Sequence, residues 1–222
     1  MRYLLLIFIL INCKKAELTE FSFGLSMEKI FTDTNGNGKN DAVGYYINNP
    51  SDYRIVYQEH DTNENGKTNL FIWSGFSAVT VPNRAEKETV KVHEAEDLDH
   101  DGKVDILRWL LPNGYIALTQ VDNDKDGYFE TTNYYNREKR IVRSEVDTNK
   151  DGYPDKFYWQ NRVEVDTDFD KYPDHVGISN SETELRKMTK ENGLKPLELK
   201  NSWILNPELV PKLHRSIIQI QN

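Results

Sequence analysis

The chain has 222 residues and a formal net charge of −8, and hydrophobic residues make up 37% of it. This length fits one domain with a small appendage, and the acidic balance argues against nucleic acid as a partner, because phosphate binding needs a basic face. The single cysteine excludes an internal disulfide framework and a cysteine-based zinc site. Aromatic residues reach 11%, which is typical of a folded, sheet-rich domain and not of a disordered chain.

The first thirteen residues have the pattern of an export signal. Arg2 is followed by an unbroken apolar run over 4–11, which is shorter than the roughly 20 residues that cross a bilayer and suits the centre of a secretion signal. The chain then reads Leu10-Ile11-Asn12-Cys13, which resembles a bacterial lipobox, in which the cysteine is lipidated and becomes the mature N-terminus. Leu10 matches that pattern at −3, whereas Asn12 at −1 departs from its usual small residue.

The lipobox resemblance implies a signal peptide over 1–12 and a lipidated tether over 13–20, with the lipid on Cys13. It also implies a protein of the bacterial cell envelope, anchored to a membrane, with the outer membrane or the cell surface preferred over the inner membrane. An ordinary signal peptide, or an apolar first strand with an incidental cysteine, is the alternative.

A nine-residue acidic pattern occurs six times between residues 33 and 174. Every copy has aspartate at position 1, aspartate or asparagine at positions 3 and 5, and aspartate, glutamate or asparagine at position 9. Glycine stands at position 6 in five copies, and Lys171 replaces it in the last. The copies are DTNGNGKND (33–41), DTNENGKTN (61–69), DLDHDGKVD (97–105), DNDKDGYFE (122–130), DTNKDGYPD (147–155) and DTDFDKYPD (166–174).

Oxygen ligands at this spacing suit calcium, which takes six to eight oxygens at roughly 2.3–2.6 Å. Glycine at position 6 supplies a positive-φ turn, position 7 offers its backbone carbonyl, and position 9 completes the shell. The sequence therefore predicts at least three calcium ions. The candidate ligands are Asp33, Asn35, Asn37, Lys39 and Asp41; Asp61, Asn63, Asn65, Lys67 and Asn69; Asp97, Asp99, Asp101, Lys103 and Asp105; Asp122, Asp124, Asp126, Tyr128 and Glu130; Asp147, Asn149, Asp151, Tyr153 and Asp155; and Asp166, Asp168, Asp170, Tyr172 and Asp174.

The repeats are not EF-hands, because that motif needs a glutamate at position 12 and a helix after it. None of the six copies has an acidic residue at position 12, and β-favouring runs such as Ile106-Leu107-Arg108-Trp109 follow the loops. The loops resemble the DxDxDGxxD calcium loops that connect strands in integrin-type FG-GAP repeats. This resemblance implies structural calcium sites between strands, and the alternative is that the Asp-Gly and Asn-Gly runs are only turns.

The six loops differ in their number of carboxylates. Loops 97–105 and 122–130 offer four each and loop 147–155 offers three, so we expect calcium there first. Loop 33–41 offers two and loop 61–69 only one. Loop 166–174 has four, but Lys171 at the glycine position costs about 1 kcal/mol of strain. Occupancy of loops 61–69 and 166–174 stays open.

The segments between the loops predict β-hairpins, as where 105–111 and 115–121 flank Pro112-Asn113-Gly114. Because every spacer goes out and returns, the fold class is all-β, with about eleven strands in an antiparallel meander over 21–180. The meander could be a curved sheet, a barrel or propeller-like, and all six loops lie along one side of it. A capping box at 181–184 and Asn192-Gly193 predict a helix over 182–192 within a helical cap at 181–222.

Counting onward from each loop, position 13 is aromatic in five repeats: Tyr45, Trp73, Trp109, Tyr134 and Trp159. Alternate residues of a strand share a face, and position 11 is mostly apolar. We therefore expect a buried column of rings across the sheet. The alternative is an exposed aromatic platform for sugars.

The sequence contains no serine-hydrolase, zinc-peptidase, P-loop or dinucleotide-binding motif. We therefore expect no catalytic residues, and a secreted, lipid-anchored calcium-binding β-repeat protein whose calcium is structural. Its role would be surface binding, adhesion or envelope structure. The expected partners are a membrane, through the lipid, and an extracellular or envelope ligand that is a protein or a glycan. The alternative is a calcium-dependent carbohydrate-binding protein or a polysaccharide-processing enzyme.

Overall fold

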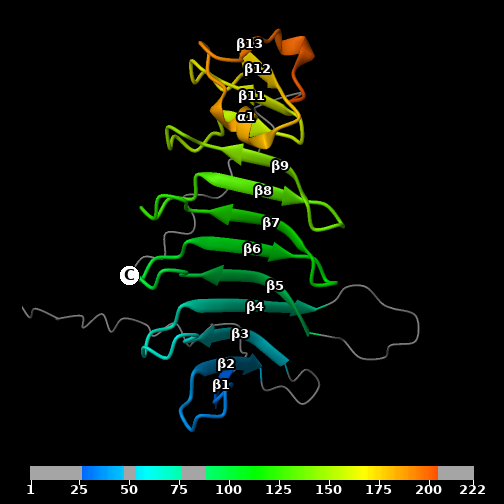
Figure 1. Ribbon diagram of the computed structural model, residues 1–222. Helices are drawn as coiled ribbons and strands as arrows, with labels where there is room; N and C mark the ends of the chain where they lie inside the picture. The colour runs from blue at the N-terminus through cyan, green and yellow to red at the C-terminus, as the bar shows by residue number, and fades with distance from the viewer. Residues whose placement is uncertain (1–26, 48–53, 77–88, 205–222) are drawn as a thin grey trace, which may run out of the picture.

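A computed structural model describes residues 27–47, 54–76 and 89–204. They form one antiparallel sheet whose strands follow each other in chain order (Figure 1). The strands are β1 Met27–Thr32, β2 Ala42–Ile47, β3 Arg54–His60, β4 Leu70–Phe76, β5 Thr89–Glu96, β6 Ile106–Leu110, β7 Ile116–Val121, β8 Thr131–Tyr135, β9 Ile141–Val146, β10 Lys156–Tyr158, β11 Arg162–Val165, β12 His175–Ile178 and β13 Lys195–Pro196. Two short helices, α1 Glu182–Lys187 and η1 Leu199–Asn201, flank β13 in the sequence.

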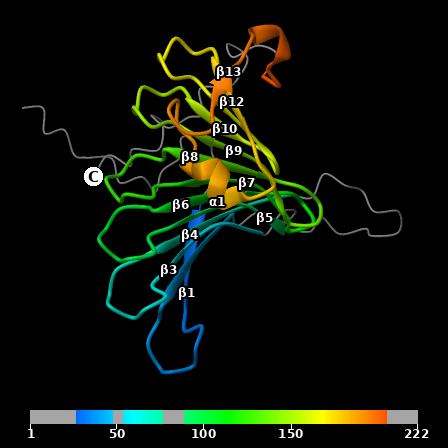
Figure 2. The same ribbon diagram turned by 45° about the horizontal axis from the view of Figure 1, so that its top comes forward.

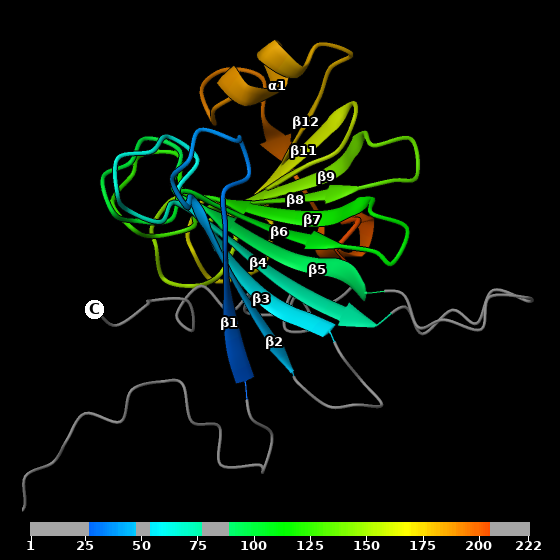
Figure 3. The same ribbon diagram turned by 90° about the horizontal axis from the view of Figure 1, so that it is seen from below.

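The sheet is open, with β1 and β13 as its edges, so the predicted antiparallel meander is confirmed as a twisted sheet and not as a closed barrel or propeller (Figure 2). It has thirteen strands where the sequence indicated about eleven. The two further strands follow the last acidic loop: β12 lies within the range 21–180 predicted for the meander, and β13 lies within the predicted cap at 181–222. The six acidic loops connect β1–β2, β3–β4, β5–β6, β7–β8, β9–β10 and β11–β12. They therefore gather along one side of the sheet, as expected (Figure 3).

The predicted helix begins where expected but is shorter. Ser181 caps it by accepting a hydrogen bond from the Glu184 amide at 3.3 Å. The helix ends at Lys187 and not at 192, because Met188 adopts an extended backbone with ψ at 135°. Gly193, with φ at +94°, belongs to a tight turn that leads into β13 and not to the helix end.

The two faces of the sheet are packed differently. Opposite residues in an antiparallel pair share a face, which places Tyr45, Tyr57, Trp73, His93 and Trp109 on one face, called here the ring face. Ala95, Leu107 and Phe129 form a buried cluster on this face, with Trp73 and Trp109 packed against it. On the other face, α1 packs its Leu185 against β11, in a second cluster with Val163, Val165 and Leu194.

The predicted aromatic column is present, but its members and its burial differ from the expectation. Five rings stack in a row, Tyr45, Tyr57, Trp73, His93 and Trp109, with centroids 4.7–5.3 Å apart and planes tilted by 35–40°. All five are half-buried and not buried, because the sheet is a single layer over most of its length. Beyond Trp109 the next strand offers Leu118, and Tyr134 and Trp159 contact the Arg143 guanidinium instead.

Candidate metal sites

Each acidic loop is organised by the aspartate at position 1. In loop 97–105, Asp97 accepts hydrogen bonds from the amides of His100 at 2.7 Å and Gly102 at 2.8 Å. The first aspartate of the other five loops likewise accepts the amide of position 6, at 2.6–2.9 Å. These contacts turn the chain back on itself and leave the position-1 carboxylates of the last four loops buried.

The residue at position 9 closes each loop. Its side-chain oxygen accepts the backbone amide of position 2, as between Asp105 and Leu98 at 2.6 Å or between Asp155 and Thr148 at 2.6 Å. The same bond occurs in the other four loops, including the one closed by Asn69. The residue at position 9 therefore stabilises the closed form of the loop, in addition to the metal-ligand role that the sequence predicted.

Two positions of each loop, and not one, have a left-handed backbone. Position 6 has φ between +81° and +96°, as predicted, and Lys171 adopts this conformation with φ at +81°. Position 4 is also left-handed, although five of the six loops have a residue other than glycine there: Glu64, His100, Lys125, Lys150 or Phe169. This conformation could not be predicted from the sequence, because only one loop has glycine at position 4, namely Gly36.

Three of the loops bring together acidic groups that could hold a metal ion. Their carboxylate oxygens lie within 4.8 Å of one another in Asp97, Asp99 and Asp101, in Asp122, Asp124 and Glu130, and in Asp166, Asp168 and Asp170. Carboxylate oxygens so close together are suited to a hard divalent cation such as calcium.

Two of these three clusters lie in loops where the sequence predicted that calcium binds first. Loops 97–105 and 122–130 contain acidic clusters, as expected. The third cluster is in loop 166–174, where the strain at Lys171 does not prevent the loop from forming, and not in loop 147–155. Asn149 at position 3 of that loop contributes an amide oxygen in place of a carboxylate. Loops 33–41 and 61–69 have the same backbone form with amide side chains at positions 3 and 5.

Electrostatics distinguishes the last cluster from the other two. Burial, reinforced by its neighbours Asp168 and Asp170, raises the pKa of Asp166 to about 6. In contrast, the hydrogen bond from Lys125 lowers the pKa of Asp99, and that from Lys150 lowers the pKa of Asp126. Only in the first two clusters does an ammonium group from the next loop meet the carboxylates.

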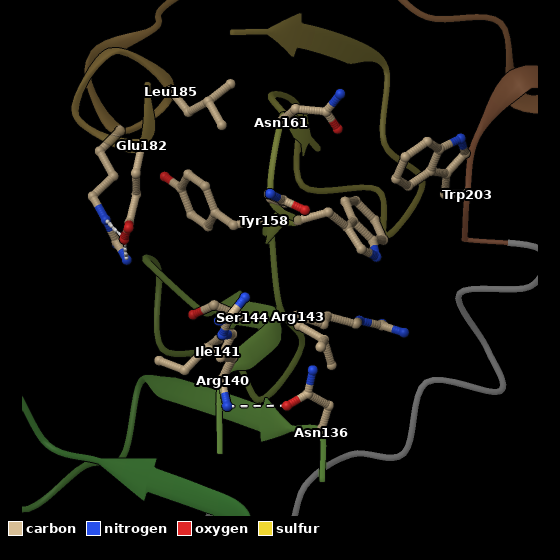
Figure 4. A pocket seen from close by; sticks show the side chains of 14 residues that line it. Asn136, Arg140, Ile141, Arg143, Ser144, Tyr158, Asn161, Glu182, Leu185 and Trp203 are labelled. Carbon is tan, nitrogen blue, oxygen red and sulfur yellow. Dashed lines mark hydrogen bonds and ion pairs between the residues drawn. The ribbon is translucent and has the colours of Figure 1, made fainter. Parts of the chain in front are cut away.

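A cavity of about 560 Å³ lies at the opposite side of the sheet from the loops. It forms because β9 extends past the three-residue strand β10, whose last pair is Tyr158 with Ser144. Tyr158, Trp159, Trp203 and Arg143 border it (Figure 4). Trp159 and Trp203 meet edge to face at 5.2 Å. Among the described residues that line it, Glu182 is the one carboxylate, and it accepts a hydrogen bond from Arg186.

No known protein family matches the chain, and no curated protein matches it. Among solved structures, the crystal structure of TarM is similar with a TM-score of 0.36 and 11% identity, over 60% of this chain and 21% of that chain. The structure of accessory secretory proteins 1, 2 and 3 of Streptococcus pneumoniae gives a TM-score of 0.31 and 13% identity, over 64% of this chain and 19% of that chain. The chain thus spans about a fifth of the length of these two chains.

Among the described residues, no helix has the length and apolar character needed to cross a membrane. The predicted export signal and Cys13 lie outside the described residues, as do residues 205–222 of the predicted cap.

Proposed function

We propose that this is a secreted, lipid-anchored calcium-binding β-repeat protein in which calcium fixes the loop side of the sheet. The observation that supports it best is the set of three acidic clusters in loops of one common geometry. Calcium is the preferred metal because the donors are all oxygens and the loops supply aspartate and asparagine at alternate positions.

The calcium would be structural. In the last cluster, Asp166 is 3% exposed and lies beside two further aspartates, so like charges repel one another and burial disfavours their ionised form. A divalent cation removes both costs. Extracellular calcium modules bind at about 10⁻⁴–10⁻³ M, which suits a protein of the cell surface.

The test of calcium binding compares thermal unfolding in calcium and in excess chelator. A ligand that binds only the native state raises its stability by mass action, by about 2.7 kcal/mol at a hundred times Kd, so we expect the melting temperature to fall by several degrees in chelator. The double variant Asp99→Ala with Asp124→Ala removes exposed ligands from two of the three clusters and should lose a large part of this difference, while the cluster at Asp166 keeps the rest. Glu138→Ala, an exposed acidic residue at the opposite side of the sheet, is the control. Identical melting curves of the wild type with and without calcium would refute the proposal.

The proposed location rests on the sequence alone. Lipidation of Cys13 would anchor the protein to a membrane of the bacterial envelope and leave the sheet free to bind a surface ligand. Cys13→Ser should move the protein from the membrane fraction to the soluble fraction. Equal fractionation of the two proteins would contradict the anchor.

Calcium-dependent carbohydrate binding is the second candidate, and the cavity supports it. The Trp203 side chain is 53% exposed and lies beside Trp159 and Arg143, an arrangement that suits stacking on a sugar ring. The ring face supports it less, because its rings stack on one another and are half-buried. A glycan-binding screen of the wild type and of Trp203→Ala tests this candidate. Binding that survives the substitution excludes the cavity as the glycan site.

A further inference from the structure

The side chain at position 4 of one loop reaches the preceding loop. Consecutive loops are two strands apart, hence about 10 Å, and the left-handed backbone at position 4 directs a long side chain across that gap. Lys125 places its Nζ 2.5 Å from Asp99 Oδ2. Lys150 places its Nζ 2.9 Å from Asp124 Oδ2 and also binds Asp126.

The charge of this side chain complements the loop that it contacts. Loops 97–105 and 122–130 have aspartates at positions 3 and 5, and both receive a lysine. Loop 33–41 has Asn35 and Asn37 there, and it receives Glu64, whose two carboxylate oxygens accept from the two amide groups at 2.7 Å each. In these three loop pairs the residue at position 4 is therefore matched in charge to positions 3 and 5 of the preceding loop.

The lysines bind the oxygens that a cation would use. Asp99 belongs to the first acidic cluster and Asp124 to the second. An ammonium group and a calcium ion at the same oxygens repel each other, and the partly exposed lysine side chains can swing into water when the ion enters. Among the described residues, no lysine of another acidic loop contacts the carboxylates of the third cluster, which lies in loop 166–174.

We propose that Lys125 and Lys150 are internal competitors for calcium, each of which sets the affinity of the loop before its own. This inference rests on the proposed function and deepens it, because it states how two of the metal sites are regulated. A positive charge about 6 Å from a divalent cation in water-like surroundings weakens its binding roughly tenfold. Removing one lysine should therefore strengthen one site and leave the other unchanged.

Each of the two loops contains a glycine amide that can report calcium binding at that loop. The Gly102 amide donates to Asp97 at 2.8 Å and the Gly127 amide donates to Asp122 at 2.7 Å. Calcium on these carboxylates shifts the amide resonances, so a calcium titration of the full chain labelled with ¹⁵N-glycine gives a midpoint for each loop.

We expect Lys125→Gln to lower the calcium midpoint at Gly102 about tenfold without changing that at Gly127, and Lys150→Gln to do the reverse. Lys125→Arg keeps the charge and should stay near the wild type. Lys139→Gln removes a lysine with the same left-handed backbone, φ +61°, at the opposite side of the sheet, and should change neither midpoint.

Two negative results are distinguishable. If the wild type shows calcium-dependent shifts and the lysine variants have midpoints within twofold of it, the competition is refuted and calcium binding stands. If neither the wild type nor the variants show a shift at either glycine, the proposed function fails at these loops, and the inference fails with it.

Discussion

The indole of Trp73 stacks on the imidazole of His93, with ring centroids 4.9 Å apart and planes tilted by 35°. His93 stacks in turn on Trp109 at 4.7 Å, so a titratable ring stands between two tryptophans. Its Nδ1 lies 3.0 Å from the backbone oxygen of Arg108, which can only accept, so Nδ1 carries a proton and donates. Burial lowers the pKa of His93. The column therefore favours the neutral imidazole.

Acidification should weaken the fold through His93. Its folded pKa lies below the ordinary value of 6.5, so between the two values the unfolded chain binds more protons. The contribution of neutral His93 to the free energy of unfolding is complete above about pH 6.5. It is lost as the pH falls toward the pKa of His93 in the folded protein. His60, whose pKa is also lowered by burial, acts in the same direction.

Urea unfolding at pH 7.5 and at pH 5.0 measures this loss. His93→Tyr keeps an aromatic ring in the column and removes the titration, so the variant should lose less stability than the wild type between the two pH values. An equal loss in both proteins would show that His93 does not contribute.

The half-buried column sets the cost of removing one of its rings. Trp109 packs against buried Leu107 and against His93. Full burial would make Trp109→Ala cost roughly 3–5 kcal/mol, and because Trp109 is only half-buried we expect about 2–3 kcal/mol in the free energy of unfolding. Chemical denaturation gives the value. A loss below about 0.5 kcal/mol, the range of ordinary surface substitutions, would contradict the packing role.

The repeat made the loops predictable, whereas several contacts between them were not. Counting from each loop correctly placed Trp73 and Trp109 on one face, because that strand always starts at the same position. The return strands start at variable distances from the loop, so the count did not find Tyr57 and His93. Position 4 was missed for a different reason: lysine gives no sequence signal for a left-handed backbone that the fold imposes.

Glycine at position 6 is favoured for its backbone conformation, and Gly152 tests this separately from packing. Its φ is +94°, and a Cβ added there meets no atom within 4 Å. Gly152→Ala should therefore cost about 1–2 kcal/mol of stability from backbone strain alone. Gly152→Asn should cost less, because asparagine tolerates the left-handed region. Thermal unfolding in chelator makes the comparison without metal, and equal effects of the two variants would contradict this explanation.

Glu164 attaches the end of the described chain to the ring face of the sheet. Its carboxylate is fully buried and accepts from Arg162 Nε at 2.7 Å, from Ser202 Oγ at 2.5 Å and from the Trp203 amide at 2.8 Å. This role could not be predicted from the sequence, because the partners of Glu164 lie up to 39 residues away.

Removing this carboxylate should release the segment around Trp203. Glu164→Ala leaves the Arg162 guanidinium, whose side chain is 12% exposed, without its buried partner. Breaking a buried ion pair costs roughly 3–5 kcal/mol, and we expect a loss of that order in the free energy of unfolding. Tryptophan fluorescence of the native protein should also shift to the red as Trp203 leaves Trp159. Glu198→Ala is the matched control, because its pair with Lys200 is exposed and should contribute at most about 0.5 kcal/mol. If Glu164→Ala is as stable as this control and keeps its fluorescence spectrum, Glu164 does not hold the segment in place.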